Sequence, residues 1–200
     1  MTAMHTIGHS NHDIDAFIAL LRLHDVTAIA DVRSHPVSRR FPQFDKKPLQ
    51  ASLMAAGIRY VFLGEGLGAR PRDPACYVRG RADFDRIRAA SAFVEALARL
   101  QCGAEEYRIC LMCAERDPAD CHRTWLVTQA LHDAGATITH ILADGAIEPH
   151  AALLRRIAGA DSGTGSLFDD DAELLTATAR REAQRVAYSQ DRQHSEDDVE

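Results

Sequence analysis

The sequence predicts an α/β protein with an open, mostly parallel, five-stranded sheet and helices on both faces, a three-layer sandwich of Rossmann-like or flavodoxin-like type. Short apolar runs alternate with longer segments whose apolar residues recur at helical spacing, the pattern of consecutive strand–helix units. Of the 200 residues, 46% are hydrophobic and 26% are charged, which is ordinary for a chain with a sizeable core and excludes a fibrous or wholly disordered protein. We therefore expect right-handed crossovers and a sheet that is covered on both faces.

Five apolar segments are predicted to be the strands. The second, residues 26–32, is nearly continuous in apolar residues, as expected of a strand that is buried on both faces. Cys110 and Cys113 belong to the fourth strand and its end, and their odd spacing places the two side chains on opposite faces. This C-x-x-C is therefore not expected to chelate a metal, and Cys110 is expected in the core. The strands are expected at residues 4–8, 26–32, 58–63, 107–112 and 137–142.

Helices are predicted between the strands from apolar spacing and from capping signals. Phe17 and Leu21 share one face of the first helix. Asp117 or Asp120 can cap the helix after the fourth strand, and Gly135 can end it. The other helices are expected at about residues 48–56, 84–100 and 148–158, and residues 69–81 are expected to form an extended loop.

A single domain is predicted over residues 1–158, followed by an acidic linker and tail over residues 159–200. Eleven acidic residues and four arginines lie from residue 159 onward, so the net charge of −6 comes from the tail and the domain is nearly neutral. A polar helix is expected within residues 169–190, and the last ten residues are expected to be disordered.

We expect a cytoplasmic protein that has no contact with a membrane. The longest apolar runs are far shorter than the about 20 residues that cross a bilayer, and the N-terminus lacks the basic and apolar regions of a secretory signal. The five cysteines are irregularly spaced and do not suggest a disulfide framework. The sequence leaves the oligomeric state open.

Polar residue types follow four successive strands of the predicted sheet. Parallel strands end at one edge, where open α/β sheets bind their ligands, so these residues are expected to form a site. Two alternatives stay open, because residues after the first strand are also common helix caps and because Asp31 with Arg33 would also make a structural ion pair. The third strand leads into the glycine-rich residues 64–68, and the others lead into His9 and Ser10, into Asp31, Arg33 and Ser34, and into Cys113, Glu115, Cys121, His122 and Arg123.

An enzyme of the hydrolase or transferase class is the leading hypothesis. Cys121 is expected in the first turn of a helix, where free backbone amides, His122 and Arg123 favour a thiolate nucleophile. A small apolar structural role for Cys121 is an open alternative. Glu115 or Asp31 would act as general base or nucleophile. The predicted catalytic residues are Asp31, Cys113, Glu115, Cys121 and His122.

Two basic loops at the predicted edge favour a phosphate-bearing ligand, either a small molecule such as a nucleotide or a nucleic acid. Residues 31–47 carry five basic side chains against two carboxylates, and residues 69–81 carry four arginines. Phe41, Phe44 and Tyr77 lie among them and could stack on bases. A solvated basic face, or a non-catalytic nucleic-acid-binding or adaptor module, is the alternative. The predicted substrate-binding residues are His9, Ser10, Arg33, Ser34, Arg39 and Arg123.

A metal site is a further hypothesis, although no cofactor is predicted outright. Cys113, Cys121 and His122 could bind zinc or iron, with Glu115 or His9 as a fourth ligand. Against this hypothesis, the spacing C-x7-C-H matches no standard zinc module, and adjacent side chains on a helix diverge by about 100°.

Several of these segments resemble the signature of the domain of unknown function (DUF) family 488. The most specific is Cys113-Ala114-Glu115 followed by Cys121-His122-Arg123, which is similar to the family's C-x-E…C-H-R block. The resemblance covers about residues 4–145, and it implies a single α/β domain in which the block belongs together with Asp31 and Arg33. It implies no reaction. The other matching segments are Thr6-Ile7-Gly8-His9-Ser10, Asp31-Val32-Arg33-Ser34-His35-Pro36, Ser38-Arg39-Arg40-Phe41 and Gly57-Ile58-Arg59-Tyr60.

A short segment of the tail hints at a protein partner. Ser166-Leu167-Phe168 resembles the end of a sliding-clamp-binding peptide, with Thr164 where such peptides usually carry glutamine. An apolar anchor for the tail is the alternative role of this segment.

Overall fold

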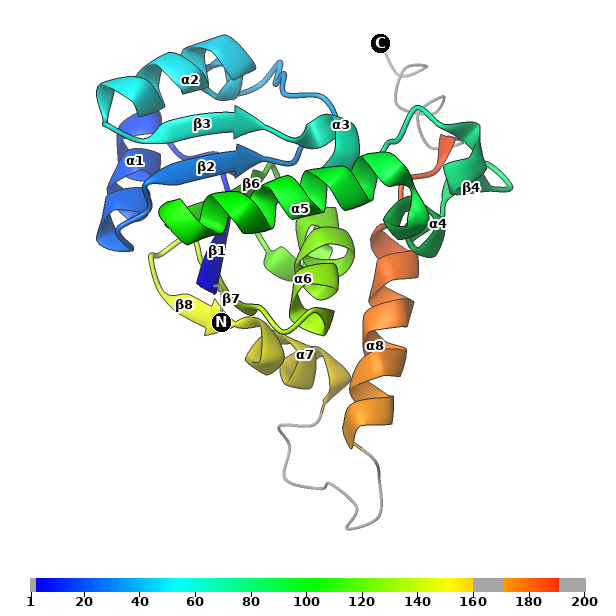
Figure 1. Cartoon of the computed structure of the whole chain (residues 1–200). Coiled ribbons are helices and arrows are strands. Elements are labelled where there is room, and N and C mark those ends of the chain that lie inside the picture. Colours follow the sequence, from blue (N-terminus) through cyan, green and yellow to red (C-terminus); the bar gives the residue numbers. More distant parts are fainter. Residues whose placement is uncertain (1–2, 160–170, 191–200) are drawn as a thin grey trace.

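A six-stranded sheet forms the centre of the computed structural model, which describes residues 3–159 and 171–190 (Figure 1). The strands are β1 (Ala3–Gly8), β2 (Ala28–Asp31), β3 (Arg59–Phe62), β6 (Ile109–Cys113), β7 (Thr137–Ile141) and β8 (Ile147–Pro149). Their order is β3-β2-β6-β1-β7-β8, and every pair is parallel except β7 with β8. The mostly parallel sheet is confirmed, with one strand more than the five predicted, because residues 147–149 form a short antiparallel edge instead of the start of the last helix.

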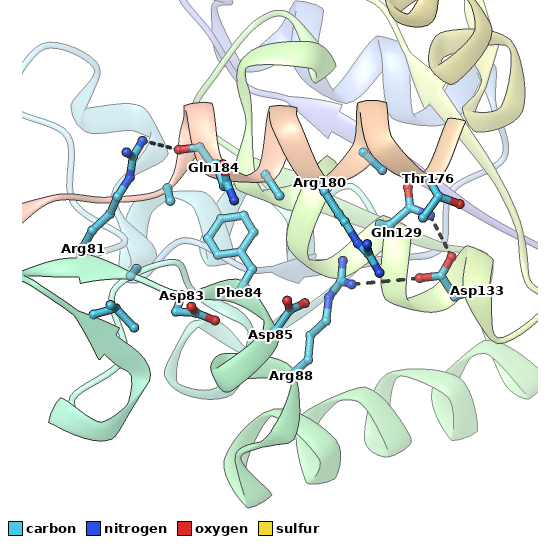
Figure 2. Close-up of a pocket in the computed structure, with 15 residues that line it drawn as sticks. Arg81, Asp83, Phe84, Asp85, Arg88, Gln129, Asp133, Thr176, Arg180 and Gln184 are labelled. Atoms are coloured by element: carbon cyan, nitrogen blue, oxygen red, sulfur yellow. Dashed lines mark hydrogen bonds and ion pairs between the residues drawn. The ribbon is translucent and has the colours of Figure 1, made fainter. Parts of the chain in front are cut away.

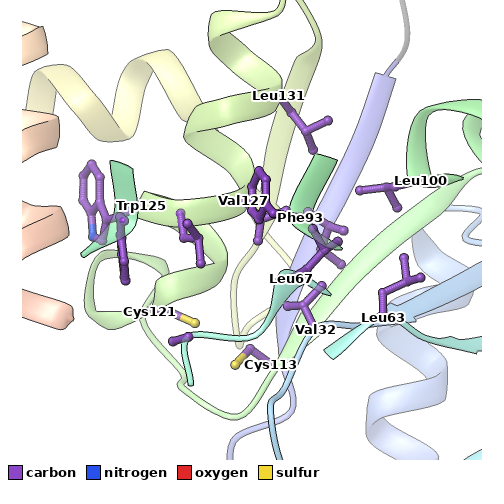
Figure 3. Close-up of a cluster of buried hydrophobic side chains, with 14 of the residues drawn as sticks. Val32, Leu63, Leu67, Phe93, Leu100, Cys113, Cys121, Trp125, Val127 and Leu131 are labelled. Carbon is purple, nitrogen blue, oxygen red and sulfur yellow. The ribbon is translucent and has the colours of Figure 1, made fainter. Parts of the chain in front are cut away.

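Helices cover both faces of the sheet, as predicted. On one face, α1 (Ile14–Leu23) and α2 (Lys46–Ala55) pack on the apolar side chains of the strands. On the other face lie α5 (Ser91–Glu106), a π-helical segment (Arg123–Thr128) that continues into α6 (Gln129–Asp133), and α7 (His150–Ala158). Figure 3 shows the core of this second face, including Phe93, Leu100 and Trp125.

The side chains of β6 alternate between the two layers. Cys110 and Met112 are buried with α1 and α2, whereas Leu111 and Cys113 are buried on the opposite face. Cys110 is a core residue, and the C-x-x-C pair points in opposite directions, as expected.

Two local predictions between β3 and β6 are wrong. The helix predicted over residues 84–100 is two helices, α4 (Phe84–Ala89) and α5, because Ala90 is extended (φ −71°, ψ 139°). The predicted extended loop contains a hairpin of β4 (Tyr77–Val78) and β5 (Arg81–Ala82). Arg79 and Gly80 both have positive φ, as a two-residue hairpin turn of this kind requires.

The glycine-rich residues 64–68 form a helical turn, α3 (Gly64–Leu67), that packs on the segment after β2. A Cβ atom at Gly64 would lie 1.9 Å from the carbonyl oxygen of Arg33, and one at Gly68 would lie 2.4 Å from Ser34 Oγ. The glycines therefore let two chain segments at the edge of the sheet approach closely.

The predicted polar helix of the tail is present as α8 (Asp171–Val186), and it packs on the body of the protein. Ala179 and Ala187 are buried in the same apolar cluster as α5. The boundary predicted at residue 158 stays a prediction, and Ser166, Leu167 and Phe168 lie outside the described residues. Within the described ranges, no helix is long and apolar enough to cross a bilayer.

Candidate functional site

A cleft of about 380 Å³ lies at the carboxyl ends of β1, β2 and β6, the edge where the sequence predicts a site. Five of the predicted site residues lie outside the lining of the cleft: Asp31, Cys121, Ser10, Arg39 and Arg123. The predicted residues that line it are His9, Arg33, Ser34, Cys113, Glu115 and His122, joined by His35, Ser38, Arg70, Val186 and Tyr188 among others.

Asp31 and Arg33 form a buried ion pair beside the cleft. Arg33 Nη2 lies 2.7 Å from Asp31 Oδ2, and Arg33 Nε lies 2.9 Å from Oδ1, a bidentate contact. The Tyr60 hydroxyl donates to Oδ2 over 2.7 Å, and the backbone N–H of Arg33 donates to Oδ1 over 3.1 Å. Because four donors occupy its two oxygens, Asp31 is placed to hold Arg33 in position.

His9 lies between Arg33 and Phe44. Its Nδ1 is 3.0 Å from the carbonyl oxygen of Ser10, which can only accept, so Nδ1 carries the proton and Nε2 accepts from Arg33 Nη1 over 3.3 Å. Burial lowers the pKa of His9 to about 4, and its ring stacks on Phe44 with centroids 4.3 Å apart. Phe44 is buried in this stack, so the prediction that it could stack on a base is wrong.

Four side chains with metal-binding atoms meet at the end of β6: Cys113, Glu115, Cys121 and His122, here called the Cys–Glu–His cluster. Their four potential ligand atoms all lie within 4.8 Å of one another. Cys113 Sγ lies 3.6 Å from His122 Nδ1, and Cys121 Sγ lies 2.8 Å from Glu115 Oε2. Figure 3 shows Cys113 and Cys121 at the border of the apolar cluster. The structure thus brings together four of the five predicted catalytic residues.

The backbone at Cys121 differs from the prediction and explains this convergence. Asp117 caps only a 3-10 turn (Pro118–Asp120), and the π-helical segment begins at Arg123. Cys121 lies between them in extended conformation (φ −124°, ψ 139°), so it is not in the first turn of a helix. The angular divergence of adjacent helical residues therefore does not apply, and both the sulfur of Cys121 and the ring of His122 reach the cluster.

A backbone contact fixes the tautomer of His122. Its Nε2 lies 3.0 Å from the carbonyl oxygen of Val32, so Nε2 carries the proton and donates it to that oxygen. Nδ1 then faces Cys113 Sγ and, at 4.0 Å, Cys121 Sγ. A histidine whose second nitrogen is held by a carbonyl is the usual arrangement for a metal ligand.

The charges of the Cys–Glu–His cluster are strongly coupled. Burial alone would raise the pKa of Glu115, but the charge of His122 and the thiol donors lower it to about 2. Burial also opposes ionisation of Cys121, yet the hydrogen bond from Cys113 and the charge of Arg123 lower its pKa to about 6. For Cys113, burial dominates and raises the pKa well above its usual value. Cys113, Cys121 and His122 are buried whereas the Glu115 side chain is exposed, so the cluster holds its negative charge at the boundary between the core and the cleft.

Arg123 lies beneath the cluster and not in the cleft. Its guanidinium is fully buried, and Nη1 donates to the carbonyl oxygen of Glu115 over 2.7 Å. Its backbone N–H donates to Cys121 Sγ over 3.3 Å. Arg123 thus fixes the loop that carries the cluster and places a positive charge close to the two sulfurs.

A chain of buried polar side chains leads from Arg123 across the core. Arg123 Nε donates to Thr6 Oγ1 over 3.3 Å, and Thr6 Oγ1 donates to His140 Nδ1 over 2.8 Å. His140 Nε2 donates to His150 Nδ1, and His150 Nε2 donates to Gln129 Oε1, each over 3.1 Å. The amide oxygen of Gln129 can only accept, so it sets the direction of every bond when both imidazoles are neutral. Burial lowers the pKa of His150 to about 3 and that of His140 well below its usual value.

This chain predicts acid sensitivity of the metal-free protein. A histidine whose pKa is lowered by folding stabilises the folded protein fully above its unfolded-state pKa of 6.5. For His150, this stabilisation is lost as the pH falls from 6.5 toward about 3. The variant His150→Gln keeps one donor and one acceptor but cannot titrate. We expect its free energy of unfolding to fall less steeply below pH 6.5, by up to about 1.4 kcal/mol per pH unit.

Urea unfolding at several pH values between 7.5 and 5 measures this slope. Burial would lower the pKa of His122, but the hydrogen bond with the Cys121 sulfur raises it. His122 therefore changes the pH dependence of the unfolding free energy in the opposite direction, and it does so equally in the wild type and in His150→Gln. If the unfolding free energies of the wild type and His150→Gln depended on pH in the same way, His150 would not be held neutral.

A second cavity, of about 450 Å³, lies between α8 and α4 (Figure 2). Arg88 lies 3.9 Å from Asp133, and Arg81 donates to the carbonyl oxygen of Gln184. None of the described residues that line it is a cysteine or a histidine. The contact of Arg81 joins α8 to the body. The potential metal-binding groups of the lining are the carboxylates of Asp83, Asp85 and Asp133, and Asp133 is paired with Arg88.

Sequence reasoning missed several contributors to the cleft. Tyr60 lies on the neighbouring strand and donates to Asp31. It stands two residues before Phe62, which is paired with Asp31 in the register of β2 and β3. The sequence could reveal this contact only if that register were known. Val186 and Tyr188 come from the segment treated as tail. No local pattern in residues 186–190 points to the cleft.

Comparison with protein-family models gives a match over most of the α/β body. The family model described as Domain of unknown function DUF488 matches residues 13–130, more than half of the chain. The matched segment contains Asp31, Arg33 and the whole Cys–Glu–His cluster. Searches of the curated proteins and of the solved structures give no match. The chain therefore belongs to the family of domain of unknown function DUF488.

Proposed function

We propose that the Cys–Glu–His cluster binds a transition-metal ion, best zinc, and that the cleft above it takes a phosphate-bearing substrate. The observation that carries the proposal is the approach of four ligand atoms from four side chains to within 4.8 Å of one another. Two thiolates, one imidazole and one carboxylate are all known zinc ligands, and iron is the second candidate for such a set.

The distances within the cluster suit a tetrahedral ion. Ligands bound to zinc at about 2.0–2.3 Å lie about 3.3–3.8 Å from one another. Cys113 Sγ and His122 Nδ1 are 3.6 Å apart, and Cys121 Sγ and His122 Nδ1 are 4.0 Å apart. Cys121 Sγ with Glu115 Oε2 at 2.8 Å is closer than this range, and the ligand atoms of the cluster lie within 4.8 Å of one another, so ion binding would draw the side chains to intermediate distances.

The charge of the cluster favours the same conclusion. The Cys121 thiol donates to Glu115 Oε2 over 2.8 Å, and once that proton leaves, the thiolate and the carboxylate repel each other unless a cation lies between them. Arg123 supplies one positive charge from below, but its guanidinium donates to the Glu115 carbonyl and to Thr6, and only its backbone N–H bonds to the Cys121 sulfur. Its Nη2 is buried with no hydrogen-bond partner among the described residues. A divalent cation would neutralise the remaining charge.

The cleft offers donors for an anionic substrate beside this centre. Four of the five N–H groups of the Arg33 guanidinium bond to Asp31, Phe44 and His9, which leaves one on Nη1. Arg70 is exposed at the mouth, and its backbone N–H donates to Ser34 Oγ over 3.0 Å. With Cys113, Cys121 and His122 as its ligands and Glu115 displaced from the fourth position, the ion would have a place for the substrate. It would there stabilise the charge that develops on a phosphoryl group, so hydrolysis or transfer of a phosphate ester is the reaction class that we propose. The ligand is either a nucleotide-like small molecule or a nucleic acid.

Covalent catalysis by Cys121 fits the geometry less well. Its sulfur is fully buried and does not line the cleft, whereas a nucleophile must reach the substrate. Cys113 does line the cleft, but burial raises its pKa and disfavours the free thiolate. Both sulfurs are better placed to bind a metal.

Elemental analysis of protein purified without a metal-affinity tag tests the proposal. We expect about one zinc ion per chain, and at least about a 100-fold loss of zinc affinity in Cys113→Ser and in His122→Ala, measured by competition with a chromophoric chelator. Cys110→Ala, a buried cysteine of the same strand that faces the other layer, and Cys102→Ser, an exposed one, are the matched controls and should bind zinc like the wild type. Absence of stoichiometric zinc or iron, also after incubation with either ion, would refute the metal centre.

A further inference from the structure

We infer that the C-terminal segment of residues 186–190 is part of the substrate cleft, and that Tyr188 is a positioning residue that holds Arg70 for the anionic group of the substrate. This inference rests on the proposed function and adds to it the element that determines how the anion is bound.

The C-terminal segment lines the same cleft as the Cys–Glu–His cluster. Val186 and Tyr188 form part of its wall, together with Arg33 and His122. The segment of the chain that the family model matches ends at residue 130, so this wall comes from a part of the protein beyond the family match.

Backbone hydrogen bonds fix the C-terminal segment against the hairpin of β4 and β5. The N–H of Ala82 donates to the carbonyl oxygen of Tyr188 over 2.8 Å, and the N–H of Gln190 donates to that of Gly80 over 2.9 Å. Arg81 and Ser189 form an antiparallel bridge, and Ala187 is buried. Residues 187–190 are thus held like an additional strand beside β5.

The helix before this segment is anchored next to the cluster. Arg185 donates to the carbonyl oxygen of Ala119 over 2.8 Å and pairs with Asp120 at 2.9 Å, just before Cys121 in the chain. Glu182 is buried and pairs with Arg185. Figure 2 shows α8 along the second cavity, where Arg81 of β5 donates to the carbonyl oxygen of Gln184. The position of Tyr188 is therefore fixed at both ends.

Tyr188 meets the cation that is best placed to bind an anion. The guanidinium carbon of Arg70 lies 4.4 Å from the centre of the Tyr188 ring, a cation–π contact. Among the described residues, no carboxylate forms an ion pair with Arg70, so its positive charge is not neutralised within that part of the protein. A guanidinium stacked on a ring keeps its N–H groups free at the edge, where they can bind phosphate oxygens.

Titration of the zinc-loaded full-length protein with pyrophosphate tests the inference by calorimetry. We expect Tyr188→Leu, which removes the aromatic face, to weaken pyrophosphate binding about tenfold, the effect of a well-placed cation–π contact. Tyr188→Phe keeps that face and should restore the affinity to within about twofold. Zinc content and melting temperature, measured on each variant, report whether the cluster and the fold are intact.

Arg70→Gln provides an independent arm, because Arg70 is exposed and its replacement does not endanger the fold. It should weaken pyrophosphate binding at least as much as Tyr188→Leu does. The double variant should lose no more pyrophosphate affinity than Arg70→Gln alone. Pyrophosphate binding that Tyr188→Leu leaves unchanged, or additive losses in the double variant, would overturn the role of Tyr188 and leave the proposed function in place. A wild type that binds zinc but no pyrophosphate would overturn the proposed substrate class together with this inference.

Discussion

Asp31→Ala is expected to lower the free energy of unfolding by about 3–5 kcal/mol, because it leaves the charge of Arg33 buried without its partner. Asp31 is completely buried, and Arg33 is 5% exposed. Removal of the carboxylate also deprives the Tyr60 hydroxyl and the Arg33 backbone of their acceptor. Urea unfolding of the metal-free protein measures the loss.

Two further variants distinguish the unpaired charge from a simple loss of hydrogen bonds. Tyr60→Phe removes one of the four contacts to Asp31 and should cost about 1 kcal/mol. The double variant Asp31→Leu/Arg33→Met removes both charges and should recover much of the stability that Asp31→Ala loses. If the double variant were less stable than Asp31→Ala, the buried charge would not be the main source of the effect.

Gly8→Ala is the second substitution with a large expected effect. A Cβ atom at this position would lie 1.8 Å from the carbonyl oxygen of Glu115 and 3.2 Å from Arg123 Nη1. Neither segment can withdraw easily, since the N–H of His9 donates to the carbonyl oxygen of Cys113 over 2.9 Å and Arg123 holds Glu115. We expect a loss of at least about 3 kcal/mol in the free energy of unfolding, together with loss of zinc.

Gly103→Ala is the matched control for this substitution. Gly103 lies inside α5, and its Cβ atom would meet only the end of the Ile109 side chain, at 3.3 Å. Because alanine favours a helix over glycine by about 1 kcal/mol, this variant should unfold within about 1 kcal/mol of the wild type and keep its zinc. Equal stability of the two variants would show that the loop of Glu115 yields to a methyl group.

The parts of the site that follow directly from strands could be predicted from the sequence. The apolar residues 26–32 predict a strand buried on both faces, and the structure places β2 within that segment with Asp31 and Arg33 at its end. The odd spacing of Cys110 and Cys113 likewise predicts opposite faces of β6. Both conclusions depend only on the alternation of side chains along a strand.

The other features of the site depend on the local backbone conformation and on contacts between residues that are distant in the sequence. The convergence of Cys121 with His122 depends on one extended residue between two helical turns, which helical spacing does not reveal. The partners of Arg123 and Arg70 are Thr6 and Tyr188, each more than a hundred residues away. Such contacts become visible only when the order of the strands and the position of α8 are known.

The strand order also determines which piece of the chain can fold by itself. β1 occupies the interior of the sheet between β6 and β7, so residues 3–8 find both of their neighbours only after the chain has been synthesised past residue 141. The segment 13–130 contains β2, β3 and β6 but neither β1 nor β7, and by itself it would expose the backbone edge of β6 that β1 covers. We therefore expect the autonomous folding unit to extend beyond the segment that the family model matches, at both ends. Its many pairings between distant segments should make it a slow folder.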